Sequence, residues 1–222
     1  MENVTDRTSN PFGMRPPCER YVAGYGDANA DFHVVGDHPG VHGGVEPRSA
    51  AGGTASSGEE VGVPFTNDAG LRLQRALVDA GLLETAGERP TVNRTFLSYL
   101  HMCVVEGTPT EREYVEMERF FDAELRAIAA HVLLPVGERA TRHVIQQYTA
   151  RPPTLADDMA SLHGTELLGG GFLVYPVRDP SEWTDGDRER LVDALTDLQA
   201  TDFYREVDLG RFLPDGDSYR VR

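Results

Sequence analysis

Apolar residues recur along this chain in two periods, which alternate from one segment to the next. Short runs of β-branched and aliphatic residues are typical of buried strands and lie at 32–36, 95–102, 132–136 and 172–177. Longer segments with apolar positions three and four residues apart predict amphipathic helices at 67–81, 114–130, 137–148 and 184–198. This order predicts an α/β fold, a three-layer α/β/α sandwich around a central parallel sheet of four strands.

The segments between these elements carry little periodicity. Residues 1–30 are rich in proline, glycine and polar residues and are expected to be irregular. The Gly/Ser/Ala-rich segment 45–61 is expected to form a mobile inserted loop, a candidate lid, and 202–222 forms a charged tail. The length of 222 residues, 40% of them hydrophobic, suits one domain spanning 1–222. No window approaches the roughly 20 apolar residues of a membrane span, so we expect a cytoplasmic protein. We also expect a monomer.

Charge argues at first against a nucleic-acid partner. The chain has 36 acidic and 21 basic residues, a formal net charge of -15, and it contains no lysine. A DNA-binding protein normally needs a positive face. The composition is, however, typical of adaptation to a salt-rich cytoplasm, where a Debye length of roughly 3 Å screens an acidic surface. Net charge therefore excludes no partner here.

Candidate chemistry gathers after the first strand. That strand breaks at Gly36 into the run Asp37-His38-Pro39-Gly40-Val41-His42, and about twenty residues later a turn with Phe65 leads into a helix beginning near Asp68. In open α/β sheets, ligands bind at the carboxyl ends of the strands. The two segments are therefore expected to place a carboxylate, a histidine and an exposed aromatic ring beside one crevice.

These segments resemble the uracil-DNA glycosylase superfamily. Gly36-Asp37-His38-Pro39-Gly40 is similar to the Gly-Glu-Ala-Pro-Gly of family 4, and Gly62-Val63-Pro64-Phe65-Thr66 to its Gly-x-Pro-Phe-Val. His42-Gly43-Gly44 and Phe65-Thr66-Asn67-Asp68 resemble family 5 signatures, and Cys103 with Thr108-Pro109-Thr110 resembles a Cys-Arg-Pro-Pro segment. The resemblance covers residues 18–198, and the chain is identified on it as a divergent, halophile-type member.

The resemblance implies a base-excision enzyme acting on single-stranded or damaged DNA. Such an enzyme extrudes a nucleotide and hydrolyses its glycosidic bond through a sugar cation. The implied roles are catalytic carboxylates at Asp37 and Asp68, an auxiliary donor at His42, base binding by Gly36, His38, Pro39, Gly40 and a stacking Phe65, and phosphate contacts from Arg139, Arg142 and Ser181.

Two departures from the family pattern bear on activity and cofactors. Asp179-Pro180-Ser181 stands where these families carry His-Pro-Ser, whose histidine stabilises the departing base anion. Either a protonated Asp179 or a donor from His38 or His42 could replace it. The family's four-iron four-sulfur cluster needs four thiolates, but only Cys18 and Cys103 remain, with Tyr21 and Met117 at the other positions. We therefore predict no cluster and no other cofactor.

Simpler interpretations stay open for each residue. Asp37 and Asp179 could cap turns, Asp68 could be a helix N-cap, Phe65 a core residue and Cys103 a small buried hydrophobe. His38 and His42 have the spacing of a zinc pair, but the Pro/Gly turn argues against a helix there, and no metal is predicted. A non-catalytic protein that binds a base or single strand is the main alternative. A phosphate-binding protein is disfavoured because no Gly-rich phosphate motif is present.

Overall fold

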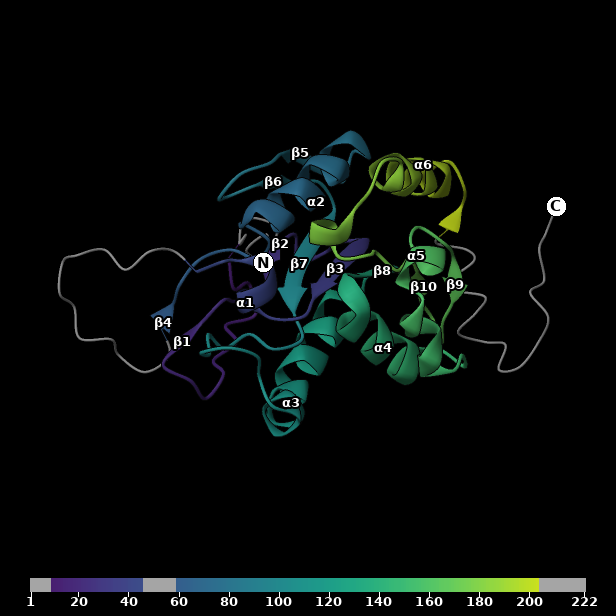
Figure 1. Cartoon of the computed structure of the whole chain (residues 1–222). Helices are drawn as coiled ribbons and strands as arrows, with labels where there is room; N and C mark the ends of the chain where they lie inside the picture. The colour runs from purple at the N-terminus through teal and green to yellow at the C-terminus, as the bar shows by residue number, and fades with distance from the viewer. Residues whose placement is uncertain (1–8, 46–58, 204–222) are drawn as a thin grey trace.

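A computed structural model describes residues 9–45 and 59–203 of the chain (Figure 1). Its centre is a six-stranded sheet with the order β2-β7-β3-β8-β10-β9. The strands are β2 (Tyr25–Gly26), β3 (Phe32–Gly36), β7 (Thr95–Tyr99), β8 (Val132–Pro135), β9 (Leu167–Leu168) and β10 (Leu173–Val174). The four inner strands are parallel, which confirms the predicted sheet. The edge strands β2 and β9 are antiparallel and were not predicted, because each stands beside glycines and outside any longer apolar run.

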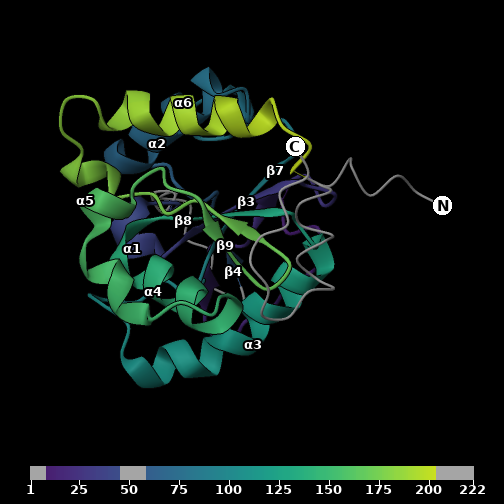
Figure 2. The ribbon, with the colours of Figure 1, turned by 90° about the vertical axis from the view of Figure 1, so that its right-hand side faces the viewer.

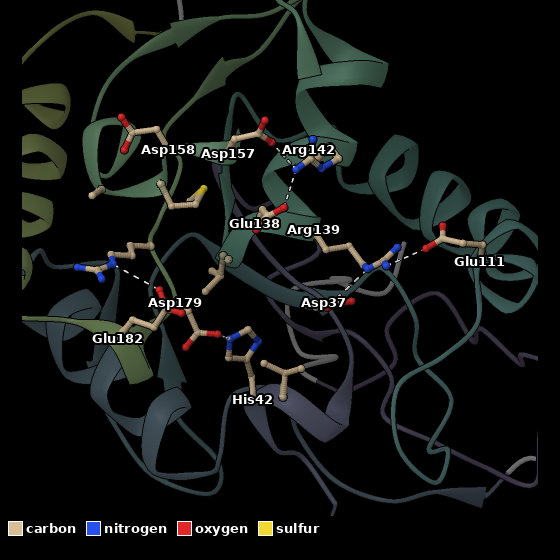
Figure 3. Close-up of a pocket in the computed structure, with 16 residues that line it drawn as sticks. Asp37, His42, Glu111, Glu138, Arg139, Arg142, Asp157, Asp158, Asp179 and Glu182 are labelled. Carbon is tan, nitrogen blue, oxygen red and sulfur yellow. Dashed lines mark hydrogen bonds and ion pairs between the residues drawn. The ribbon is translucent and has the colours of Figure 1, made fainter. Parts of the chain in front are cut away.

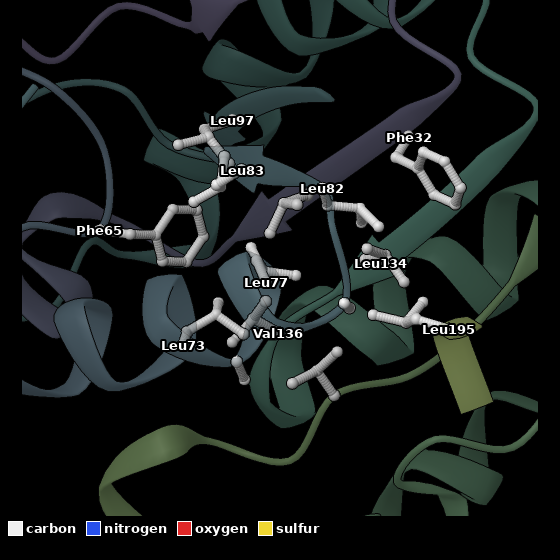
Figure 4. Packing of buried hydrophobic residues seen from close by; sticks show 14 of the residues in the cluster. Phe32, Phe65, Leu73, Leu77, Leu82, Leu83, Leu97, Leu134, Val136 and Leu195 are labelled. Atoms are coloured by element: carbon white, nitrogen blue, oxygen red, sulfur yellow. The ribbon is translucent and has the colours of Figure 1, made fainter. Parts of the chain in front are cut away.

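Helices cover both faces of the sheet, as Figures 1 and 2 show. The four long helices are α2 (Asp68–Asp79), α3 (Glu111–Ile128), α4 (Gly137–Tyr148) and α6 (Asp187–Gln199). Leucines of α2 and α6 pack with Val34 and Leu134 in the largest apolar cluster (Figure 4), whereas α3 and α4 pack with Val35 and Leu133 on the other face. Successive residues of β3 and β8 thus point to opposite faces of the sheet. The predicted three-layer arrangement is confirmed.

Helix starts are set by local capping. α3 begins three residues before the predicted Tyr114 because Thr110 and Glu113 form a capping box. The helix predicted over 184–198 begins later than expected: α6 follows Gly186, and Thr184 does not cap it but donates hydrogen bonds to the Asp187 carboxylate.

Short elements also differ from the expectations. Residues 1–30 are not wholly irregular, since β1 (Arg20–Tyr21) pairs with β4 (Glu59–Glu60) and β2 lies in the main sheet. A helix does form in the Pro/Gly turn: α1 (Pro39–His42) is one turn long and is capped by His38 Nδ1. Proline suits a first helical position, so the objection to a helix there was wrong. The described part of the chain also contains β5 (Leu83–Thr85), β6 (Thr91–Val92), α5 (Met159–Leu162) and the 3-10 turns η2 (Pro153–Asp157) and η3 (Pro180–Glu182).

Most of the predicted 45–61 loop and of the 202–222 tail lies outside the described residues. Among the helices that are described, none combines the length and the apolar character needed to cross a bilayer.

The two cysteines form a disulfide, Cys18–Cys103, with Cα atoms 6.0 Å apart. Cys103 is buried in an apolar cluster, as one interpretation expected, but its sulfur is bonded to Cys18. Tyr21 and Met117 belong to the apolar cluster around Cys103, and Cys18 packs against it. The bond joins the segment before β1 to the chain just after β7, so two regions 85 residues apart are linked beside the end of the sheet.

Candidate functional site

A cavity of about 760 Å³ opens at the carboxyl ends of β3 and β8 (Figure 3). Asp37 directly follows β3, and His42 is the last residue of α1. Arg139 and Arg142 come from the first turns of α4. The opposite wall consists of residues 157–160 and of Arg178, Asp179 and Glu182. The cavity has the size of a small-ligand site and lies at the edge where open α/β folds bind ligands.

Asp37 is held by groups from two helices. The Tyr114 hydroxyl of α3 donates a hydrogen bond to Asp37 Oδ1, and Arg139 Nε lies 4.0 Å from Oδ2. The guanidinium of Arg139 also lies 4.3 Å from the centre of the Tyr114 ring. Burial, together with the hydrogen bond to Asp37, raises the pKa of Tyr114, so the phenol stays a neutral donor. With 17% of its side chain exposed, Asp37 still reaches the cavity.

His42 and Asp179 meet on the opposite side of the same cavity (Figure 3). His42 Nε2 lies 3.3 Å from Asp179 Oδ2, while Asp179 Oδ1 accepts from the Ser181 amide at 2.8 Å and the Ser181 hydroxyl at 2.6 Å. Burial favours the neutral acid, but the contacts with His42 and Ser181 outweigh it and lower the pKa of Asp179 to about 2. Asp179 is therefore a carboxylate and not the neutral acid that the sequence left open.

The basic residues at the cavity are already paired with carboxylates. Arg139 Nη2 lies 2.8 Å from Glu111, and Arg142 Nη2 lies 2.5 Å from Glu138 and 2.7 Å from Asp157. The predicted phosphate residues Arg139 and Arg142 thus reach the site, but each is engaged. Ser181, the third predicted phosphate contact, is not among the described residues that line the cavity and instead holds Asp179.

Phe65 differs most from its predicted role. Its side chain is fully buried, so the expected exposed aromatic ring is absent at this position. The ring packs between His42 and Tyr99, at centroid distances of 5.3 and 5.2 Å. Its amide donates to the Tyr99 hydroxyl at 2.8 Å, and its carbonyl accepts from Gln74. The Phe65 ring therefore packs against His42, and because it is buried it cannot stack on an extruded base.

The predicted base-binding turn lies beside the cavity rather than on its surface. Of the described residues between Gly36 and His42, Asp37, Val41 and His42 line the cavity, whereas Gly36, His38, Pro39 and Gly40 do not. A Cβ at Gly36 would come within 2.8 Å of the Tyr99 and Phe65 rings, so glycine is needed there for close packing. His38 is buried and serves as the α1 cap.

Asp68 is exposed on the first turn of α2 and also lies outside the cavity lining. The helix cap is Asn67, whose side-chain oxygen accepts from the Gly70 amide at 2.9 Å and whose amide donates to Val41. The N-cap is therefore Asn67, the first residue of the predicted helix 67–81, and not Asp68. Tyr114 was missed as a site residue because its periodicity placed it on the apolar face of a helix.

The fold and this polar cavity define an α/β protein with a ligand site at the carboxyl ends of parallel strands. The family model of the Uracil DNA glycosylase superfamily matches residues 23–199, and the chain belongs to that superfamily. A search of the curated proteins found no match to this chain.

The positions that resemble the family's iron-sulfur ligands do not fit a cluster. The Cys18 and Cys103 sulfurs are bonded to each other, and the neighbouring Tyr21 and Met117 supply no thiolate. Across 9–45 and 59–203, no group of three or more His, Cys, Asp or Glu side chains could hold a metal ion. No chemical step is therefore assigned to a metal or cluster.

Proposed function

We propose that this protein is a DNA glycosylase, which hydrolyses the bond between a damaged base and its deoxyribose. Membership of the superfamily suggests this activity. The observation that carries the proposal is the Asp37 carboxylate, which is oriented by Tyr114 and faces the cavity at the end of β3. Uracil and other deaminated bases are the substrates that the resemblance suggests first.

Asp37 has the chemistry that this reaction needs. As the glycosidic bond breaks, positive charge develops on the sugar, and a nearby carboxylate stabilises it and orients or deprotonates the attacking water. The Tyr114 hydrogen bond leaves Oδ2 as the oxygen available for that role. Arg139, Arg142 and the amino end of α4 would meet the DNA phosphates, with the arginines exchanging their carboxylate partners for phosphate.

A second candidate function is a non-catalytic protein of the same fold that binds a base or single strand. The observation that favours it is Asp179, an ionised carboxylate where the family motif has a histidine. A carboxylate there would oppose the departure of an anionic base.

Single-turnover base release separates the two candidates. Protein in excess is mixed with labelled single-stranded oligonucleotides that carry uracil, hypoxanthine or a methylated purine, at potassium chloride from low to molar concentration. We expect abasic product from at least one of them, and Asp37→Ala should slow its formation about 100-fold or more.

Asp68→Ala is the matched control, because it removes a carboxylate outside the cavity, and it should keep most of the activity. An equal loss of activity in Asp37→Ala and Asp68→Ala would mean that Asp68 is catalytic as well. If folded protein binds every oligonucleotide but releases no base from any of them, the non-catalytic candidate is correct.

A further inference from the structure

The wall of the cavity opposite Asp37 is acidic, and each arginine that lines the cavity among the described residues is paired with a carboxylate. Asp157, Asp158, Asp179 and Glu182 line this side. The arginines that reach the cavity are each within 4.0 Å of carboxylates: Arg139 of Glu111, Arg142 of Glu138 and Asp157, and Arg178 of Glu182 and Asp187. A base entering this cavity therefore meets a negative potential.

Asp179 also occupies the place from which an anion would be stabilised. Its Oδ2 faces His42 at 3.3 Å and lies 3.9 Å from where a Cβ on Gly137, the first residue of α4, would stand. His42 and the amino end of α4 thus both lie beside the Asp179 carboxylate. Its negative charge opposes the build-up of charge on a departing uracil anion at this place.

A base that is already cationic needs no stabilisation of negative charge when it departs, in contrast to uracil. A purine methylated at N7 or N3 carries a positive charge before its bond to the sugar breaks. When the C1′–N9 bond breaks, its electron pair moves to N9 and the base leaves neutral. Water then adds to C1′, and Asp37 takes its proton. No anion stabiliser is needed, and an acidic wall favours binding of the charged base.

We propose that the cavity selects a cationic base, a purine alkylated on a ring nitrogen, and that Asp179 is the residue that determines this specificity. The inference rests on the proposed glycosylase function and names the substrate class for the same site. The carboxylate faces the cavity with 22% of its side chain exposed, and the cavity volume of about 760 Å³ accommodates a two-ring base.

The test compares two oligonucleotides of one sequence that carry a single N7-methylguanine or a single uracil. Enzyme-dependent release is measured in single turnover, after subtracting spontaneous depurination in the same buffer. The native protein should release N7-methylguanine at least 10-fold faster than uracil. Asp179→Asn, which keeps the shape but removes the charge, should reduce that preference at least 10-fold, mainly through weaker binding of the methylated oligonucleotide.

Asp193→Asn on α6 is the matched control. It changes the net charge equally, at an exposed position outside the cavity lining, and should leave the preference unchanged. Release of uracil as fast as N7-methylguanine by the native protein would overturn this inference and leave the glycosylase function standing. An unchanged preference in Asp179→Asn would also overturn it. Release of neither base, by either protein, would overturn this inference, and release of hypoxanthine in the same assay would then show that the glycosylase function still stands. The native comparison decides the matter even if the Asp179 variant fails to fold.

Discussion

The position of the Asp37 carboxylate depends on a residue 77 positions away in the sequence. Asp37 itself follows from the motif after β3, since an acidic residue at a strand end beside glycines is a recognisable pattern. The Tyr114 hydroxyl that orients it has no such pattern. Its aromatic ring satisfies the helical period, and only the packing of α3 against the sheet edge brings its polar end to Asp37.

Replacing Tyr114 by phenylalanine should slow base release without weakening DNA binding. A hydrogen bond to a charged group contributes about 1.5–3 kcal/mol, so its loss should cost roughly 10- to 100-fold in the single-turnover rate at saturating protein.

Tyr148→Phe serves as the control for this variant. Tyr148 donates to Asp122 Oδ1 at 2.8 Å in the same helical layer and does not line the cavity. It should leave the rate unchanged. If the two variants lose activity equally, the effect of Tyr114 is one of stability and not of positioning.

At the scale of elements, the packing of α3 against the sheet buries two ionisable groups. Glu124 of α3 and His33 of β3 are both fully buried in the same layer, and His33 Nε2 lies 2.7 Å from the Ser98 hydroxyl. Burial raises the pKa of Glu124 to about 8, against the opposing effect of Ser98, and lowers the pKa of His33 to about 3. Both groups are therefore neutral in the folded protein near neutral pH.

These shifts predict an unusual dependence of stability on pH. Between pH 4.5 and 8 the unfolded chain has lost the Glu124 proton that the folded protein keeps, so the free energy of unfolding falls by about 1.4 kcal/mol per pH unit. Between pH 3 and 6.5 the unfolded chain binds the His33 proton that the folded protein lacks, and stability rises equally. The two slopes cancel between pH 4.5 and 6.5, and only the fall remains up to pH 8.

Glu124→Gln should remove the decrease in the free energy of unfolding that Glu124 causes as the pH rises. Measured by urea denaturation, the variant should become progressively more stable than the native protein between pH 4.5 and 8. Glu116→Gln on the exposed face of α3 should show no such trend. A difference that is constant with pH would show that Glu124 is ionised in the folded protein.

At the scale of the whole molecule, a net charge of -15 must coexist with a polyanionic ligand. Each phosphate contact to single-stranded DNA contributes a slope of about −0.7 in the logarithm of affinity against the logarithm of salt concentration. If Arg139 and Arg142 meet two phosphates, the expected slope is no steeper than about −1.4, and screening of the acidic surface flattens it further.

Binding of an undamaged single strand between 0.1 and 2 M potassium chloride measures this slope. We expect it to lie between about −1.4 and zero, and Arg142→Gln should make it shallower by about 0.7. A slope near −5 would mean that a larger basic surface contacts the strand, and the DNA path proposed from α4 would then be wrong.

The sequence by itself determined the four parallel strands, the four long helices, the family and five of the cavity residues, Asp37, His42, Arg139, Arg142 and Asp179. It could do so because periodicity reports which face of an element is buried, and because the turn after a strand is a local structure. The helix starts were partly readable too, since Thr110 and Glu113 carry the capping-box signature.

Only the tertiary structure decided which residues from distant parts of the chain contact one another. Phe65 is buried because Gly36 lets its ring pack against Tyr99, and Asp68 is exposed on α2 outside the cavity lining. The Cys18–Cys103 bond and the Tyr114–Asp37 contact likewise join segments far apart along the chain. Local pattern fixes the face of a residue, but its partner depends on how distant elements pack, and the charge of this cavity is a property of those partners.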